Sequence, residues 1–230
     1  MIGAPSGAAT MQTAHARPLQ GGKPSRLAAL CLAGILLVSN LPAHPYQVAI
    51  NPGARALFLQ VGTGTMAGGD YSSGGTPQDN ATINLVSLSL TAANLGTGPV
   101  TMTSNSPVVN SPYDTFAFCT PPTQVYVGGF FRRNGGGPNS QATLSVTTPA
   151  SLVSAAADTI PFTAISWVSG GAGDPTPTIP SGAFTGGTQT LLTFPRNNWF
   201  ESCLTFVFAN AQAYPAGTFN GRATFTLSAP

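Results

Sequence analysis

Short segments of alternating apolar and polar residues, separated by Gly, Pro and Asn, dominate this chain. Its 230 residues include 27 glycines and 21 prolines. Both residue types disfavour helix interiors, so antiparallel strands joined by turns are favoured over helix bundles and coiled coils. We expect one all-β domain, an Ig-like or jelly-roll-like antiparallel β-sandwich of about nine or ten strands. The main predicted strands are 56–61, 83–92, 124–133, 142–146, 159–168, 188–194, 199–208 and 218–227.

Three local patterns add detail to this expectation. Residues 124–133 and 142–146 flank Gly135-Gly136-Gly137-Pro138, which predicts a β-hairpin. The segment 151–157 (SLVSAAA) is the one stretch with helical character. Residues 218–227 are predicted to form one long strand. Its core-facing residues would be Phe219, Ala223, Phe225 and Leu227.

The N-terminus has the layout of a secretory signal peptide. Arg17, Lys23 and Arg26 precede the apolar run 27–38, and 39–43 ends in small residues. This run is too short to cross a bilayer as a helix. We predict cleavage after residue 43, giving a signal peptide 1–43, a mature domain 44–230, and a location in the periplasm, at the cell surface or outside the cell.

The predicted mature segment carries few charges and no lysine. It contains five arginines and six acidic residues, which leaves it close to neutral. A nucleic-acid-binding surface requires clustered Lys and Arg, so this function class is excluded, as is electrostatic binding to a membrane. The doublet Arg132-Arg133 either contacts an acidic ligand or protects Phe130-Phe131 from edge-to-edge pairing.

Two cysteines, Cys119 and Cys203, remain after removal of the signal peptide. An even pair in an oxidising compartment predicts a disulfide. A nucleophilic cysteine would need a base, and the only histidine after cleavage is His44. We therefore expect the pair to be structural.

The candidate catalytic and metal-binding residues are sparse, and we expect no enzymatic activity and no cofactor. Asp158 and Glu201 both lie beside predicted strands, and a carboxylate pair of this kind would suit glycoside cleavage. The alternative is that Asp158 caps a turn while Glu201 points outward from its strand. Zinc lacks sufficient ligands. Asp70, Asp79 and Asp174 lie in Gly-rich loops and offer oxygen ligands for calcium, but they form no spaced acidic motif, so we expect solvated turns and no metal site. Asn80 begins a glycosylation sequon.

Tyr126, Trp167 and Trp199 are candidate sugar-stacking residues. They would form a binding platform only if their rings share an exposed face, and the alternative is that they belong to the core. With such a platform the protein would be a monomeric carbohydrate-binding module, which is the alternative to a structural role.

The C-terminal segment 213–227 (AYPAGTFNGRATFTL) resembles the last strand of bacterial fimbrial subunits and related secreted coat-type proteins. The resemblance implies a surface structural or adhesive role and assembly by β-strand addition, in which a neighbour's N-terminal extension completes the domain. The implied partners are further copies, other surface subunits and a periplasmic chaperone. Residues 44–53 (HPYQVAINPG) would be the donor, with Tyr46, Val48 and Ile50 alternating along it.

Overall fold

The computed structural model describes residues 47–135, 137 and 140–230, and these residues form an all-β structure. The predicted signal peptide and Tyr46 lie outside the described residues. Two short 3-10 turns, η1 (Ala92–Asn94) and η2 (Phe162–Ala164), are the only helical elements in the described part of the chain. No helix among these residues has the length and hydropathy needed to cross a membrane.

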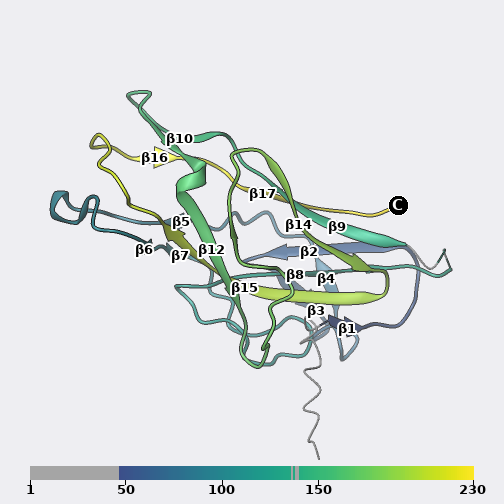
Figure 1. Ribbon diagram of the computed structural model, residues 1–230. Coiled ribbons are helices and arrows are strands. Elements are labelled where there is room, and N and C mark those ends of the chain that lie inside the picture. Colours follow the sequence, from purple (N-terminus) through teal and green to yellow (C-terminus); the bar gives the residue numbers. More distant parts are fainter. Residues whose placement is uncertain (1–46, 136, 138–139) are drawn as a thin grey trace, which may run out of the picture. The chain divides into compact units, whose positions relative to one another are not determined.

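Eight of the strands in the described segments are four residues or longer, and nine are shorter (Figure 1). The longer strands are β2 (Ala56–Val61), β8 (Val125–Arg132), β9 (Gln141–Thr147), β10 (Ser151–Ser154), β12 (Ile165–Gly170), β14 (Thr188–Pro195), β15 (Asn198–Phe208) and β17 (Thr224–Ser228). The shorter strands are β1 (Gln47–Ala49), β3 (Thr65–Ala67), β4 (Thr76–Gln78), β5 (Val86–Ser87), β6 (Val100–Thr101), β7 (Thr103–Ser104), β11 (Thr159–Pro161), β13 (Gly182–Ala183) and β16 (Phe219–Asn220).

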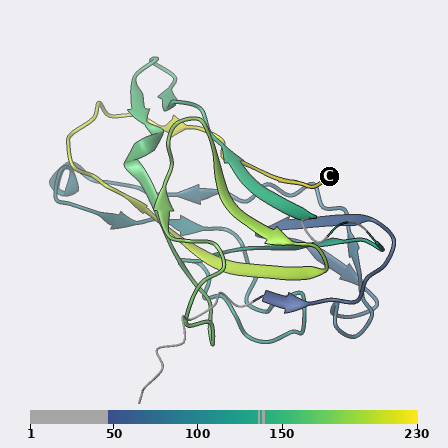
Figure 2. The ribbon, with the colours of Figure 1, turned by 45° about the vertical axis from the view of Figure 1, so that its right-hand side comes forward.

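Every strand pairing is antiparallel, as predicted. The largest sheet has the order β13-β12-β15-β8-β2, and the short strands β1 and β6 also pair with β15. Two three-stranded sheets have the orders β14-β9-β17 and β11-β10-β16. Figure 2 shows the yellow-green β15 running beneath the adjacent strands β14 and β9. Strands β3 and β4 form one two-stranded ladder, and β5 and β7 form another.

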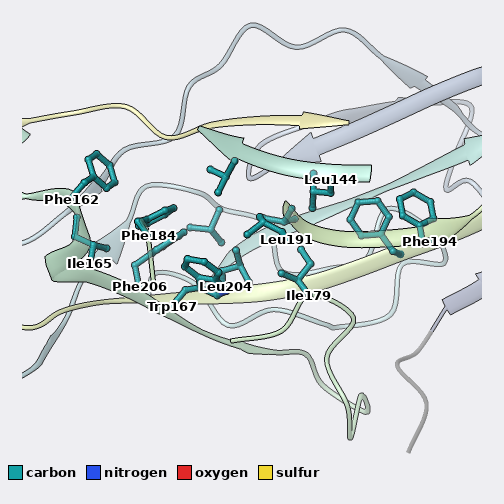
Figure 3. Packing of buried hydrophobic residues seen from close by; sticks show 14 of the residues in the cluster. Leu144, Phe162, Ile165, Trp167, Ile179, Phe184, Leu191, Phe194, Leu204 and Phe206 are labelled. Atoms are coloured by element: carbon teal, nitrogen blue, oxygen red, sulfur yellow. The ribbon is translucent and has the colours of Figure 1, made fainter. Parts of the chain in front are cut away.

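The main hydrophobic core takes side chains from the largest sheet and from β9 and β14. Leu144 of β9, Phe194 of β14 and Leu204 of β15 are almost fully buried in it. Figure 3 shows the packing of these side chains together with Trp167, Phe184 and Phe206. Burying side chains of this size contributes about 1.5–3 kcal/mol each, so this core is the principal source of stability.

The predicted hairpin between 124–133 and 142–146 is wrong. Strand β8 pairs with β2 and β15, whereas β9 pairs with β14 and β17, so the connection passes between two sheets. The burial patterns give the reason. Strand β8 is buried at almost every position, as expected for a central strand covered on both faces, while β9 alternates.

The predicted helical segment 151–157 is also wrong, because its first half is strand β10. The Ser154 hydroxyl accepts hydrogen bonds from the backbone N–H groups of Ala156 (3.2 Å) and Asp158 (3.1 Å). Ala157 adopts a φ of 66°, in the left-handed region. The serine side chain thus supports a turn that leads directly into β11, and a helix cannot continue through that turn.

The expected long C-terminal strand is interrupted between Asn220 and Thr224. Its two pieces, β16 and β17, belong to different sheets. The expected alternation nevertheless holds within β17, where Phe225 and Leu227 are partly buried against the core and Thr224 and Thr226 are exposed.

This alternation leads to a prediction for β17. Phe225→Asp places a charge against the core and is expected to lower the free energy of unfolding by more than about 2 kcal/mol. Thr226→Asp on the exposed face should change it by less than about 0.5 kcal/mol. Urea denaturation measures both, and equal effects of the two substitutions would contradict the assigned faces.

Candidate functional site

An apolar groove of about 530 Å³ opens into the main core. Its floor includes Val125 of β8, Ile165 of β12 and Phe206 of β15, all buried members of that core. The segments 82–86 and 221–225 form two of its walls. Arg222 is the one charged side chain in the lining formed by the described residues.

The interruption between β16 and β17 explains why the groove is open. Residues 221–223 make no strand pairing, so the main chain leaves the sheet edge there. A Cβ on Gly221 would lie 2.6 Å from the Leu152 side chain and 2.8 Å from that of Phe162, so these side chains would have to shift to admit another residue. The chain therefore approaches the core closely without covering it.

The opposite rim of the groove has an incompletely paired edge. Residues 83–90 keep the predicted alternation, with Val86, Leu88 and Leu90 partly buried against the core. Val86–Ser87 pairs as β5 with β7, and the Leu85 backbone is hydrogen-bonded to Asn105 on the same side, while no strand pairs with the other edge of β5 among the described residues. Ile83 and Leu85 are 66% and 61% exposed, which is unusual for large apolar side chains beside a hydrophobic groove.

A second cluster lies on the other side of β15, beneath the loops that contain Tyr71 and Tyr113. Phe58, Tyr71, Tyr113, Phe130 and Trp199 form this aromatic cluster, with neighbouring ring centroids 4.9–6.2 Å apart. Val48 and Ile50 pack against it, and β1 pairs with Asn198–Phe200 of β15. The predicted donor residues that the structure describes therefore contact their own chain.

Glu201 is buried beside this cluster and is only 5% exposed. Its Oε2 accepts three hydrogen bonds, from the Ser111 hydroxyl (2.8 Å), the Tyr126 hydroxyl (2.9 Å) and the Trp199 indole N–H (3.1 Å). The prediction that Glu201 points outward is wrong. Gly128, paired with Glu201 across the sheet, makes room for this arrangement because a Cβ there would collide with the Tyr126 hydroxyl.

Burial dominates the electrostatics of this site. Desolvation raises the pKa of the Glu201 carboxyl, and the hydrogen bonds from Ser111, Trp199 and Tyr126 oppose that increase. Desolvation, and then the nearby Glu201 charge, raises the pKa of the Tyr126 hydroxyl well above its usual range. The tyrosine therefore stays protonated and serves as a hydrogen-bond donor.

The pKa of Glu201 gives a pH-dependent prediction. A carboxyl with a raised pKa in the folded state contributes stability that is complete below its unfolded pKa, about 4.3, and is lost as the pH rises through the folded value. Glu201→Gln keeps an amide oxygen as acceptor and has no such loss. Relative to wild type, this variant should gain stability between about pH 4 and pH 8 in urea titrations. A constant difference across that range would contradict the assignment.

The other candidate site residues do not form a catalytic or stacking arrangement. Asp158 lies at the turn between β10 and β11, whereas Glu201 lies in the largest sheet, and the carboxylate that influences Glu201 is Asp114. Tyr126, Trp167 and Trp199 are all buried, so their rings form no exposed platform. Trp167 packs on Phe184 in the main core and donates its indole N–H to the Pro180 carbonyl at 2.8 Å.

Of the acidic residues considered for calcium, Asp70 and Asp174 accept local hydrogen bonds, although the Asp174 Oδ2 is buried without a partner, and Asp79 is exposed. Asp70 accepts hydrogen bonds from Ser72 and Ser73, and the bond from Ser72 is the main cause of its lowered pKa. Asp174 accepts the Thr176 N–H, and partial burial raises the pKa of its carboxyl. Across the described residues, no three His, Cys, Asp or Glu side chains form a group that could hold a metal ion. The Asn80 side chain is exposed and accepts the Thr82 N–H at 2.7 Å.

The predicted disulfide between Cys119 and Cys203 is confirmed. Their Cα atoms are 5.5 Å apart, within the usual range for a disulfide, and both residues are buried against Phe118 and Tyr126. The bond attaches the loop before β8 to the centre of β15. A disulfide is compatible with an extracellular or periplasmic location.

Comparison of the chain with protein-family models, with curated proteins and with solved structures gives no match. The groove and the Glu201 site are therefore interpreted from their own chemistry. Sequence reasoning missed both the groove and the three donors to Glu201. The sequence feature that indicates the groove is Gly221-Arg222, which interrupts the apolar alternation of the predicted strand 218–227.

Proposed function

We propose that this protein is an exported structural subunit that assembles with further copies of itself by β-strand addition at the apolar groove, as a fimbria-like protein does. The observation that carries the proposal is the opening of the main core at this groove, beside the exposed side chains of Ile83 and Leu85. An added strand would bury these apolar surfaces and pair with the free edge beside β5. On this proposal the seven-stranded sheet and the sheet β14-β9-β17 form an Ig-like or jelly-roll-like sandwich that a neighbour completes.

The proposed occupant is the segment 44–53 of a second copy. Tyr46, Val48 and Ile50 alternate along it, so one of its faces is apolar like the groove. The structure shows residues 47–49 as strand β1, paired with its own β15 at three positions, with Val48 and Ile50 packed on the aromatic cluster. Assembly would release these two side chains from their own chain, and the apolar groove of the neighbour would bury them again. Head-to-tail contacts produce filaments when their rotation does not close into a ring, and this is the assembly we propose.

The same proposal assigns no catalytic role to Glu201. Its three donors come from the protein interior, and they connect the loop at Ser111 to strands β8 and β15. We propose that this carboxylate stabilises the subunit.

The test is the assembly state of the secreted protein, measured by light scattering and electron microscopy. We expect filaments for the wild type. Leu85→Asp should remain monomeric because it puts a charge at the rim of the groove. Val168→Asp is the matched control, since Val168 is also exposed, at 57%, but is not part of the groove. A wild type that stays monomeric, or a Leu85→Asp variant that still forms filaments, would overturn the proposal.

A second experiment tests the occupant. Deleting 44–53 should give folded monomers, and a synthetic peptide of 44–53 should block filament growth of the intact protein. The peptide experiment uses the intact protein, so its result does not depend on whether the truncated protein folds. Filaments that grow normally in excess peptide would show that another segment fills the groove.

A further inference from the structure

A second cavity, of about 420 Å³, lies beside the aromatic cluster and shares no lining residue with the apolar groove. Its walls come from the segment that follows β1 (49–52), the loop 71–77, Tyr113, Phe130 and Arg132. Its volume lies in the range of small-ligand sites, about 300–1,000 Å³. The cavity is therefore large enough for a mono- or disaccharide.

Arg132 is an uncompensated cation in this cavity. No acidic side chain lies in the lining, and none of the described residues forms a hydrogen bond or an ion pair with the guanidinium group. Its Nε is buried without a hydrogen-bond partner. The terminal guanidinium nitrogens are not among the buried atoms that lack a partner, so they, rather than Nε, can donate to a ligand in the cavity.

The surroundings hold the Arg132 side chain in one place. Its Cζ lies 5.9 Å from the centroid of the Phe130 ring. Gly53 passes so close that a Cβ there would be 2.9 Å from Nε. A guanidinium positioned in this way is suited to bidentate recognition of a carboxylate.

The rest of the lining fits a polar ring rather than a lipid or an apolar peptide. Tyr71 and Tyr113 are partly exposed and supply aromatic surface beside the cation. Asn51, Ser72 and Thr76 supply polar groups around them. Aromatic rings of this kind pack against the apolar face of a sugar ring, and the polar groups form hydrogen bonds with its hydroxyls.

We propose that this cavity binds a sugar acid, a mono- or disaccharide of the uronic acid class, with its carboxylate on Arg132 and its ring against Tyr71 and Tyr113. The site differs from the predicted platform of Tyr126, Trp167 and Trp199, all of which are buried. The cavity shares no lining residue with the groove, but residues 49–52 of its wall belong to the proposed donor segment, so the site is complete only in the unassembled subunit. The non-assembling Leu85→Asp protein is therefore the form in which binding of the sugar acid is expected.

Calorimetry with three probes tests this proposal: digalacturonate, the neutral disaccharide digalactose, and inorganic phosphate. We expect digalacturonate to bind at least about tenfold more tightly than digalactose, because only the acid forms a charge-assisted pair with Arg132. It should exceed phosphate by a similar factor, because phosphate has no ring to pack against Tyr71 and Tyr113. Arg132→Gln should remove this preference. The neighbouring Arg133→Gln is the matched control and should leave it unchanged.

Four outcomes would overturn the proposal. Equal binding of the acid and neutral disaccharides would show that Arg132 does not read the carboxylate. Phosphate binding as tight as that of digalacturonate would reduce the site to a general anion site. Equal losses of digalacturonate affinity in the Arg132 and Arg133 variants would place the ligand elsewhere. No binding of digalacturonate at all would exclude it as a ligand. Circular dichroism of both variants confirms that the comparison is between folded proteins.

Discussion

Replacing Glu201 with alanine is expected to lower the free energy of unfolding by at least about 3 kcal/mol. The substitution leaves the hydroxyls of Ser111 and Tyr126 and the indole N–H of Trp199 without their acceptor in a buried site. Each unsatisfied buried donor costs about 1–3 kcal/mol. Urea denaturation at pH 7 measures this effect directly.

Glu201→Gln is the matched control, because its amide oxygen preserves an acceptor while the charge is removed. It should retain most of the stability that the alanine variant loses. Tyr126→Phe removes one donor and leaves the other two, so its effect should be smaller than that of Glu201→Ala. If the glutamine and alanine variants were equally destabilised, hydrogen bonding to Glu201 would not be the cause.

Replacing both Cys119 and Cys203 with serine is expected to lower the free energy of unfolding by about 4–5 kcal/mol. The disulfide spans 84 residues of sequence, and a cross-link of this length removes much of the conformational freedom of the unfolded chain. Denaturation of the oxidised wild type and the double variant in parallel gives the difference.

The disulfide prediction has an internal check. Thiol titration of the denatured, unreduced wild type should find neither Cys119 nor Cys203 free. The double variant should still bind digalacturonate at low temperature, because neither cysteine lies in the lining of that cavity. A double variant as stable as the wild type would show that the bond contributes no net stability.

The strands were predictable where local pattern and tertiary context agree. The bounds of β2 match the predicted 56–61, and β15 extends the predicted 199–208 by one residue. Alternation also placed Phe225 and Thr224 on the correct faces. In β17 the periodicity of the side chains is determined by burial on one face, which the sequence records directly. In β15 both faces are buried, and its length and apolar composition made it predictable.

Pairing partners and the Glu201 site were not predictable from these patterns. The glycines at 135–137 suggested a hairpin, but the choice between a turn and a crossing to another sheet depends on strands distant in sequence. Glu201 was expected to face solvent because a lone acidic residue on a strand usually does. Its burial depends on Ser111 and Tyr126, which are 90 and 75 residues away and have no spacing that marks them.

Strand β15 is shared by two packing regions. Phe200, Leu204 and Phe206 face the main core, whereas Trp199, Glu201 and Cys203 face the aromatic cluster, the hydrogen-bonded carboxylate and the disulfide. Opening either region would expose one side of the same strand and break its ladder with β8 and β12. The two regions therefore belong to one cooperative unfolding unit, and the loop over Glu201 gains its order from the centre of the domain rather than from its own short contacts.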